Sequence, residues 1–183
     1  MTVNLKDQRS YVNHPFLETL FAYDRWATRF IIETCLELTQ EEFERPVGLG
    51  LGSVERTVNH LVGTLFFFTD RLTRCASRPR LEKDGRTKTA GELRALFEQA
   101  DREFGEAVKH ALETHALTEI LNWADTDEEP LDPEDQIPYS LAFAQMIDHG
   151  IQHRTQVADM LQTLGKGLPM ALSPFVWDDA QRQ

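Results

Sequence analysis

Four long segments of the sequence repeat their apolar residues every three or four positions, the spacing expected along one face of an α-helix. The pattern predicts helices over residues 15–38, 54–76, 90–115 and 139–164. Pro15 suits a first helical turn, while Ser53 and Thr89 are favourable N-cap residues for the second and third segments. Amphipathic helices bury their apolar faces against one another, so the sequence predicts an all-α four-helix bundle.

The connections between these helices are long, which favours crossover connections over simple up-and-down packing. Residues 39–52 are largely polar, with Pro46 as a helix break. Their three glycines lack the Lys-Ser/Thr of a phosphate-binding loop and the strand before it, which indicates a linker. Residues 77–88 are polar and basic. Two short apolar runs, at 120–123 and 136–137, predict a β-hairpin between the third and fourth helices.

Two further segments are predicted to be irregular. Residues 125–135 are acidic and begin like a calcium-binding loop, but Pro130 stands where such a loop needs glycine and Gln136 where it needs glutamate. We therefore expect a solvated acidic loop. Residues 166–183 predict an irregular tail. Its apolar side chains are expected to pack against the bundle or a partner subunit, and they are Leu168, Leu172, Phe175, Val176 and Trp177.

The chain of 183 residues is long enough for one buried core, and we expect a single domain over residues 1–183. Its net charge of −11 repels phosphate backbones, so nucleic-acid binding is not expected. No apolar stretch is long enough to span a membrane, and residues 1–10 lack the apolar centre of a signal peptide. These features favour a cytoplasmic protein. Cys35 and Cys75 make no disulfide framework and are expected to be buried small residues.

Two histidines in the last predicted helix, His149 and His153, are four residues apart. On a helix both imidazoles then lie on one face, about 6 Å apart along the axis. The same face carries Ala142, Met146 and Val157, so the histidines lie within the apolar stripe. Buried imidazoles need partners, and one metal ion can bind a nitrogen of each.

His60 lies beside the apolar stripe of the second predicted helix and could complete a mononuclear site of three nitrogens. Such a site leaves positions open for water or substrate, as catalytic metal sites do. Gly150 follows His149, so the glutamate of H-E-x-x-H metalloproteases is missing, and the inner faces lack the Glu-x-x-His pairs of di-iron bundles. The residues alone leave open whether the histidines bind a metal or are satisfied core residues.

Three segments carry a resemblance that covers most of the chain. Residues 148–157 (DHGIQHRTQV) resemble the N-H-G-x-x-H-R-G-Q-[IV] signature of the DinB/YfiT-like family, which adopts a four-helix bundle. Residues 53–63 (SVERTVNHLVG) resemble the family's second-helix block with its first metal histidine, and residues 22–27 (AYDRWA) resemble its N-terminal Asn/Asp-x-x-Trp signature.

This resemblance implies a metal triad of His60, His149 and His153, with nickel or zinc as the metal. It also implies a homodimer, and some family members use low-molecular-weight thiols as transferases or isomerases. Two positions depart from the signature. Asp148 replaces the usual asparagine and adds a negative charge beside a ligand, and Thr155 replaces a glycine, which is expected to loosen a close helix contact.

Two functional hypotheses follow. In the first, the protein is a metal-dependent enzyme, a thiol S-transferase or a hydrolase, whose metal makes the nucleophile at neutral pH. In the second, it is a non-enzymatic stress-response module in which metal or buried histidines stabilise a dimeric bundle. Arg154 is expected either to hold an anionic thiol substrate or to pair with an acidic neighbour on the surface. Trp26 is expected either to line a pocket or to pack in the core.

Overall fold

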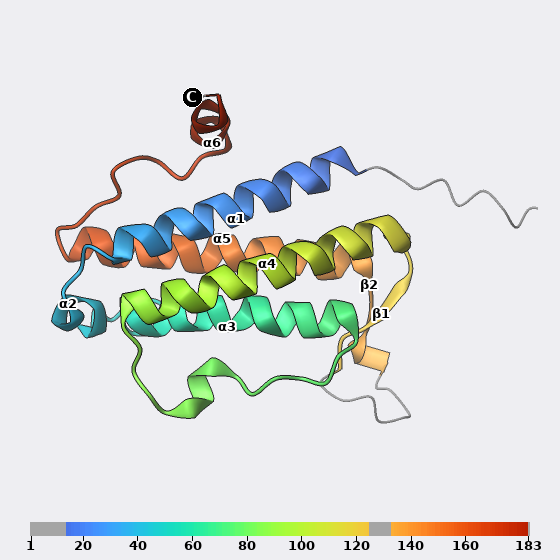
Figure 1. Ribbon diagram of the computed structural model, residues 1–183, viewed down its shortest axis with the longest axis horizontal. Helices are drawn as coiled ribbons and strands as arrows, with labels where there is room; N and C mark the ends of the chain where they lie inside the picture. The colour runs from blue at the N-terminus through green and yellow to red at the C-terminus, as the bar shows by residue number, and fades with distance from the viewer. Residues whose placement is uncertain (1–13, 125–132, 183) are drawn as a thin grey trace, which may run out of the picture.

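The computed structural model describes residues 14–124 and 133–182. Within them, six α-helices and a two-stranded antiparallel sheet are formed, and the four long helices lie side by side as a bundle (Figure 1). The predicted all-α bundle is thus confirmed. The lead-in at residues 1–13 and most of the acidic loop, residues 125–132, lie outside the described residues. The long helices are α1 (Pro15–Cys35), α3 (Val54–Thr73), α4 (Ala90–Thr114) and α5 (Tyr139–Thr163).

The four long helices pack in a square. Both α1 and α3 contact α4 and α5. The seam between α1 and α4 therefore lies opposite the seam between α3 and α5. Phenylalanines fill the space between them: the ring of Phe21 on α1 meets Phe104 on α4 and Phe143 on α5 edge-on, at centroid distances of 5.9 and 5.5 Å. Such edge-to-face pairs stabilise a core beyond the area that they bury.

The helix starts follow the capping signals in the sequence. The Ser53 hydroxyl accepts a hydrogen bond from the Arg56 amide at 3.2 Å, and Thr89 forms a full capping box with Glu92. Thr39 forms the same kind of box and begins α2 (Gln40–Glu44), whose Phe43 is buried in the core. The sequence predicted a linker without helix in this segment. The structure instead contains a short helix there, because the capping box offsets the cost of starting it.

The predicted hairpin is confirmed by β1 (Ile120–Asn122), which pairs with β2 (Gln136–Pro138) in an antiparallel register that sets Leu121 opposite Ile137. The connection from α3 to α4 contains a 3₁₀ turn, η1 (Leu81–Asp84), and a second such turn, η2 (Pro133–Asp135), precedes β2.

The irregular tail predicted at residues 166–183 is wrong in its second half. Ser173 caps a further helix, α6 (Pro174–Gln181), through a hydrogen bond from the Phe175 amide at 3.2 Å. This helix lies against α1, where the Trp177 ring stands 6.2 Å from that of Tyr23. Leu168 and Leu172 pack against the core of the bundle, whereas Phe175 is 85% exposed, and contact of the tail with a partner subunit stays a prediction.

The two cysteines differ in their surroundings. Cys35 is buried at the end of α1, and burial raises the pKa of its thiol to about 12, so it is inert at neutral pH. Cys75 is exposed, and the prediction that it is buried is wrong because α3 ends two residues before it. None of the described helices is long and apolar enough to cross a bilayer.

Close packing of α5 against α1 depends on Gly150, which is buried. A methyl group at this position would lie 2.6 Å from a carboxylate oxygen of Asp24 and 2.7 Å from the guanidinium of Arg154. We expect Gly150→Ala to lower the free energy of unfolding by about 1–3 kcal/mol, although alanine is otherwise the better helix former. Urea unfolding measures the change.

The matched control is Gly91→Ala in the exposed first turn of α4, where the nearest atom to a new methyl group is 4.0 Å away. This variant is expected to leave the unfolding midpoint unchanged or to raise it. Equal midpoints for Gly150→Ala and the parent protein would contradict the packing argument.

Candidate metal centre

The three candidate histidines meet in the seam between α3 and α5. His60 projects from α3, and His149 and His153 project from successive turns of α5. One nitrogen of each ring lies within 4.8 Å of the others, and the Nε2 atoms of His60 and His149 are 3.1 Å apart. His153 is 7% exposed, while the other two are half-buried. The tertiary structure therefore brings together the set that the sequence singled out.

Two of the three rings are held in place by hydrogen bonds at their Nδ1 atoms. His60 Nδ1 lies 2.6 Å from Glu82 Oε1, and His153 Nδ1 lies 2.8 Å from Gln156 Oε1. Because both oxygens accept, each Nδ1 carries the proton and each Nε2 keeps its lone pair. A carboxylate or amide behind a histidine orients the ring and raises the basicity of the opposite nitrogen, as it does in metal sites.

Glu82 is the residue of the candidate site that the sequence did not reveal. It stands in η1, which folds around the buried side chain of Lys88. The Lys88 ammonium donates to the Leu81 carbonyl at 3.1 Å and pairs with Asp84 at 2.9 Å, and its amide donates to buried Glu55 at 3.1 Å. A polar, basic connection was expected here, and its sequence does not show that Lys88 is buried, because lysine is almost always exposed.

The electrostatics of the cluster favour neutral imidazoles. Burial, with the neighbouring His153 and His60, lowers the pKa of His149 to about 3, and burial also lowers the pKa of His153. Partial burial disfavours the Glu82 anion, but hydrogen bonds from His60 and the backbone, with the charge of Arg80, hold its pKa below the ordinary value. At neutral pH both α5 histidines are thus unprotonated, which is the form that binds a metal.

These residues fit a metal ion. Nitrogens that share one zinc ion at about 2.0–2.1 Å in a tetrahedron lie roughly 3.3 Å apart, and the His60 and His149 pair is at 3.1 Å. Among the described residues this is the single cluster of three or more potential ligands. Three imidazoles suit zinc, nickel, copper or iron, and they leave positions for water or substrate.

One side of the cluster is closed by aromatic rings. Phe68 meets His149 edge-on at 5.7 Å, and Trp123 lies 5.8 Å from both Phe68 and Phe67. Trp123 directly follows β1, so the hairpin segment supports this aromatic wall through Phe67 and Phe68. An apolar wall limits water on that side and strengthens electrostatic interactions at the nitrogens.

Arg154 occupies neither of its expected places. It is 2% exposed, forms an ion pair with buried Asp24 at 2.6 Å and donates to the Thr28 hydroxyl at 2.9 Å. Burial raises the pKa of the Asp24 carboxyl, and the Arg154 charge opposes that shift. The predicted pairing with an acidic residue is confirmed, but it lies inside the bundle and joins α1 to α5 instead of lying on the surface. The charge of Arg154 is thus already occupied by Asp24 and is not exposed to a substrate.

The other singled-out residues lie outside the cluster. Asp148 is exposed, and Thr155 is exposed on α5, where its hydroxyl donates to the Ile151 carbonyl at 2.9 Å. The expected loosening at Thr155 is wrong, because the close contact of α5 falls at Gly150. Trp26 is half-buried and stacks on Phe30 at 5.6 Å, so it is neither in the core nor beside the histidines.

Removing the carboxylate behind His60 tests this geometry. Glu82→Gln is expected to weaken binding of a divalent metal by about 10–100-fold, the usual effect of losing such a partner. The reason is that a neutral amide stabilises the oriented imidazole less than a carboxylate does. Competition titration with a chromogenic chelator measures the affinity. Lys83→Gln, at the exposed neighbouring position of η1, is the control and should bind as the parent does. Equal affinities for both variants would remove Glu82 from the site.

Fold and site together define a class: a helical bundle with a cluster of three histidines in one seam, able to hold a metal ion. The chain belongs to the DinB family, whose sequence model matches residues 1–181. No curated protein matches the chain. The family resemblance seen in the short signatures is thereby confirmed over nearly the whole sequence.

Proposed function

We propose that the protein is a metal-dependent enzyme in which His60, His149 and His153 hold nickel or zinc, and that it transfers a group to or from a low-molecular-weight thiol. The observation that supports this most is the open ligand set. The cluster contains three imidazoles from two helices, without a fourth histidine, cysteine or carboxylate ligand among the described residues. Structural zinc sites normally have four protein ligands, whereas catalytic ones have three.

A divalent ion held by these residues would lower the pKa of a thiol and supply a thiolate nucleophile at neutral pH. Other residues of the chain would orient the histidines and limit the access of water. Glu82 and Gln156 hold two rings in place, His149 stays neutral, and Phe68 keeps water from one side. The Glu82 carboxylate already accepts a hydrogen bond from His60. A thiol ionises far more readily than water, so a metal ion held here would yield a thiolate at neutral pH without a general base, which favours thiol transfer over hydrolysis.

The test uses the protein loaded with cobalt(II) and purified without a histidine tag. Adding cysteine or glutathione is expected to change the visible absorption spectrum, and the zinc or nickel form is expected to accelerate addition of the thiol to an electrophilic dye. His153→Ala is the control for both signals. Hydrolysis of an ester without added thiol would favour the hydrolase instead.

Absence of both the spectral change and turnover would contradict the proposal. If chelation then unfolded the protein, the non-enzymatic stress-response module with a structural metal would take its place. The homodimer stays a prediction, and sedimentation velocity measures it directly.

A further inference from the structure

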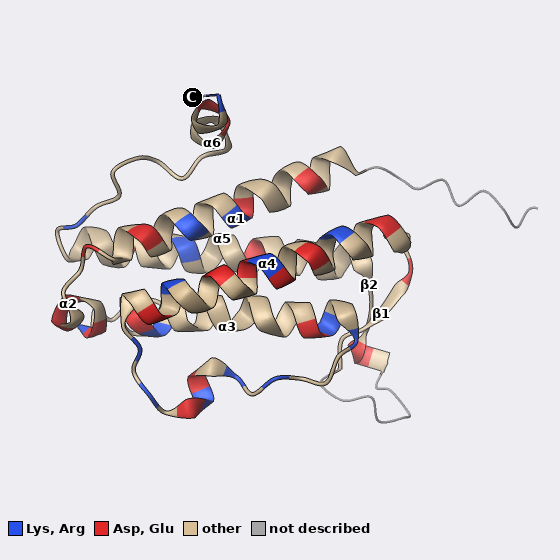
Figure 2. Cartoon of the chain, viewed as in Figure 1, with Lys and Arg blue, Asp and Glu red and all other residues tan. Residues whose placement is uncertain are grey.

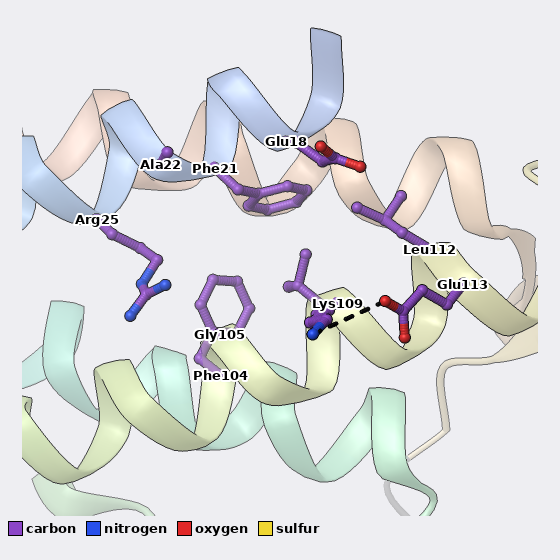
Figure 3. Close-up of a pocket in the computed structure, with 10 residues that line it drawn as sticks. Glu18, Phe21, Ala22, Arg25, Phe104, Gly105, Lys109, Leu112 and Glu113 are labelled. Carbon is purple, nitrogen blue, oxygen red and sulfur yellow. Dashed lines mark ion pairs between the residues drawn. The ribbon is translucent and has the colours of Figure 1, made fainter. Parts of the chain in front are cut away.

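A cavity of about 610 Å³ opens between α1 and α4, at the seam opposite the histidine cluster (Figure 3). Its floor is apolar: Phe21, Phe104 and Val108 line it and are each at most 4% exposed. Figure 3 shows the Phe21 and Phe104 rings between the two helices, with Leu112 farther along the seam. This volume lies within the range of about 300–1,000 Å³ that holds small-molecule ligands.

Arg25 forms a polar wall at one end of the cavity. Beyond this wall, ion pairs join α1 to α4. Figure 2 shows acidic and basic residues interspersed along both helices. Arg25 forms two hydrogen bonds with Asp101, at 2.6 and 3.0 Å, and lies across Gly105. A methyl group on Gly105 would be 2.7 Å from the guanidinium, so the missing side chain allows this arrangement.

The rim of the cavity has one unbalanced charge. Arg25 is neutralised by Asp101, and Lys109 pairs with Glu113 at 3.9 Å. Glu18, in the first turn of α1, lines the cavity and has no ion pair within residues 14–124 and 133–182. Figure 3 shows Glu18 and Glu113 toward the end of the cavity away from Arg25. The net charge of −11 adds a general attraction for cations.

We propose that this cavity binds a small amphiphilic cation, with an apolar chain or ring on the floor of Phe21, Phe104 and Leu112 and an ammonium group beside Glu18. The apolar part removes exposed aromatic surface from water. The ammonium group supplies the charge that Glu18 lacks, whereas an anionic group would be repelled. The proposal is independent of the thiol-transfer function, because the cavity and the histidines lie in opposite seams.

The test is calorimetric titration of the metal-free full chain with decylammonium and with decyl sulfate, both below their micelle concentrations. Decylammonium is expected to bind about fivefold more tightly than decyl sulfate or better. Glu18→Gln is expected to weaken decylammonium binding by about three- to fivefold, as for an exposed ion pair, and to leave decanol binding unchanged. Glu18 is exposed, so this variant keeps the fold.

A second pair of variants locates the site. Ala22→Trp places a large ring in the cavity from an exposed position of α1 and is expected to abolish binding of every probe. Ala144→Trp, at an exposed position of α5, is the control and should bind as the parent does. The metal-free protein is used because Phe104 also contacts Phe68, which packs on His149.

Three results would overturn the proposal. The first is no binding, or equal binding of decylammonium and decyl sulfate. The second is binding that survives Ala22→Trp, which would place the amphiphile elsewhere. The third is a dimeric parent that Ala22→Trp, but not Ala144→Trp, converts to a monomer, which would make the cavity a contact between two copies of the chain.

Discussion

Replacing His153 with alanine is expected to remove the bound metal almost completely, from about one equivalent per chain to roughly a tenth of that. The three nitrogens are all that the cluster offers among the described residues, so the variant leaves two donors. His153 is the most buried of the three, and its ring is held by Gln156 at 2.8 Å. Elemental analysis of protein purified without a histidine tag measures the metal content.

The control for this experiment is His110→Ala, which removes an exposed histidine of α4 outside the cluster and should keep the parent's metal content. Circular dichroism on each variant checks that the helices remain. Little metal in a folded parent protein, unchanged by His153→Ala, would refute the triad as a tight site. The histidines would then be core residues satisfied by Glu82, Gln156 and one another.

Asp24→Asn is expected to lower the free energy of unfolding by about 3–5 kcal/mol, because it leaves the Arg154 guanidinium buried without its counter-charge. Arg154 is 2% exposed and Asp24 4% exposed, so water cannot replace the lost partner. The amide has the shape of the carboxylate, so the tight fit against Gly150 is preserved. The decrease in the free energy of unfolding therefore measures the effect of removing the charge. Denaturant unfolding of the metal-free protein measures it.

The double variant Asp24→Asn/Arg154→Met separates pairing from packing. Replacing the buried, unpaired Arg154 guanidinium is expected to recover most of the lost stability, since replacing a buried ion pair with apolar groups is often close to neutral. Arg94→Met is the control on an exposed pair, because Arg94 and Glu33 meet at 2.8 Å with side chains 46% and 42% exposed, and it should leave the free energy of unfolding nearly unchanged. A loss below about 1 kcal/mol for Asp24→Asn would mean that the pair behaves like a surface salt bridge.

Much of the fold could be predicted because its signals are local. The 3.6-residue period fixed which faces of the four long helices are buried, and Ser53 and Thr89 marked two of their starts through hydrogen bonds within one turn. The short helices α2 and α6 were missed. They are too brief for a clear period, and their stability depends on contacts with the bundle, such as burial of Phe43 and the ring contact of Trp177.

In the candidate site, too, local sequence predicted one part and tertiary packing decided the other. His149 and His153 were predicted to be neighbours because residues four apart meet on any helix. Approach of His60 depends on how α3 packs against α5, and the residues alone left that open until the family resemblance was considered. Glu82 could not be found, since nothing in its local sequence shows that η1 folds back onto His60.

By itself the sequence determined an acidic helical bundle of the DinB family with two histidines on one face of its last long helix. Only the tertiary structure decided that Glu82 stands behind His60, that Arg154 is buried against Asp24, and that a cavity opens between α1 and α4. The physical reason is the distance along the chain over which each interaction acts. Helix periodicity and capping act within a turn or two, whereas these three features join residues from separate elements, and side-chain packing sets their distances.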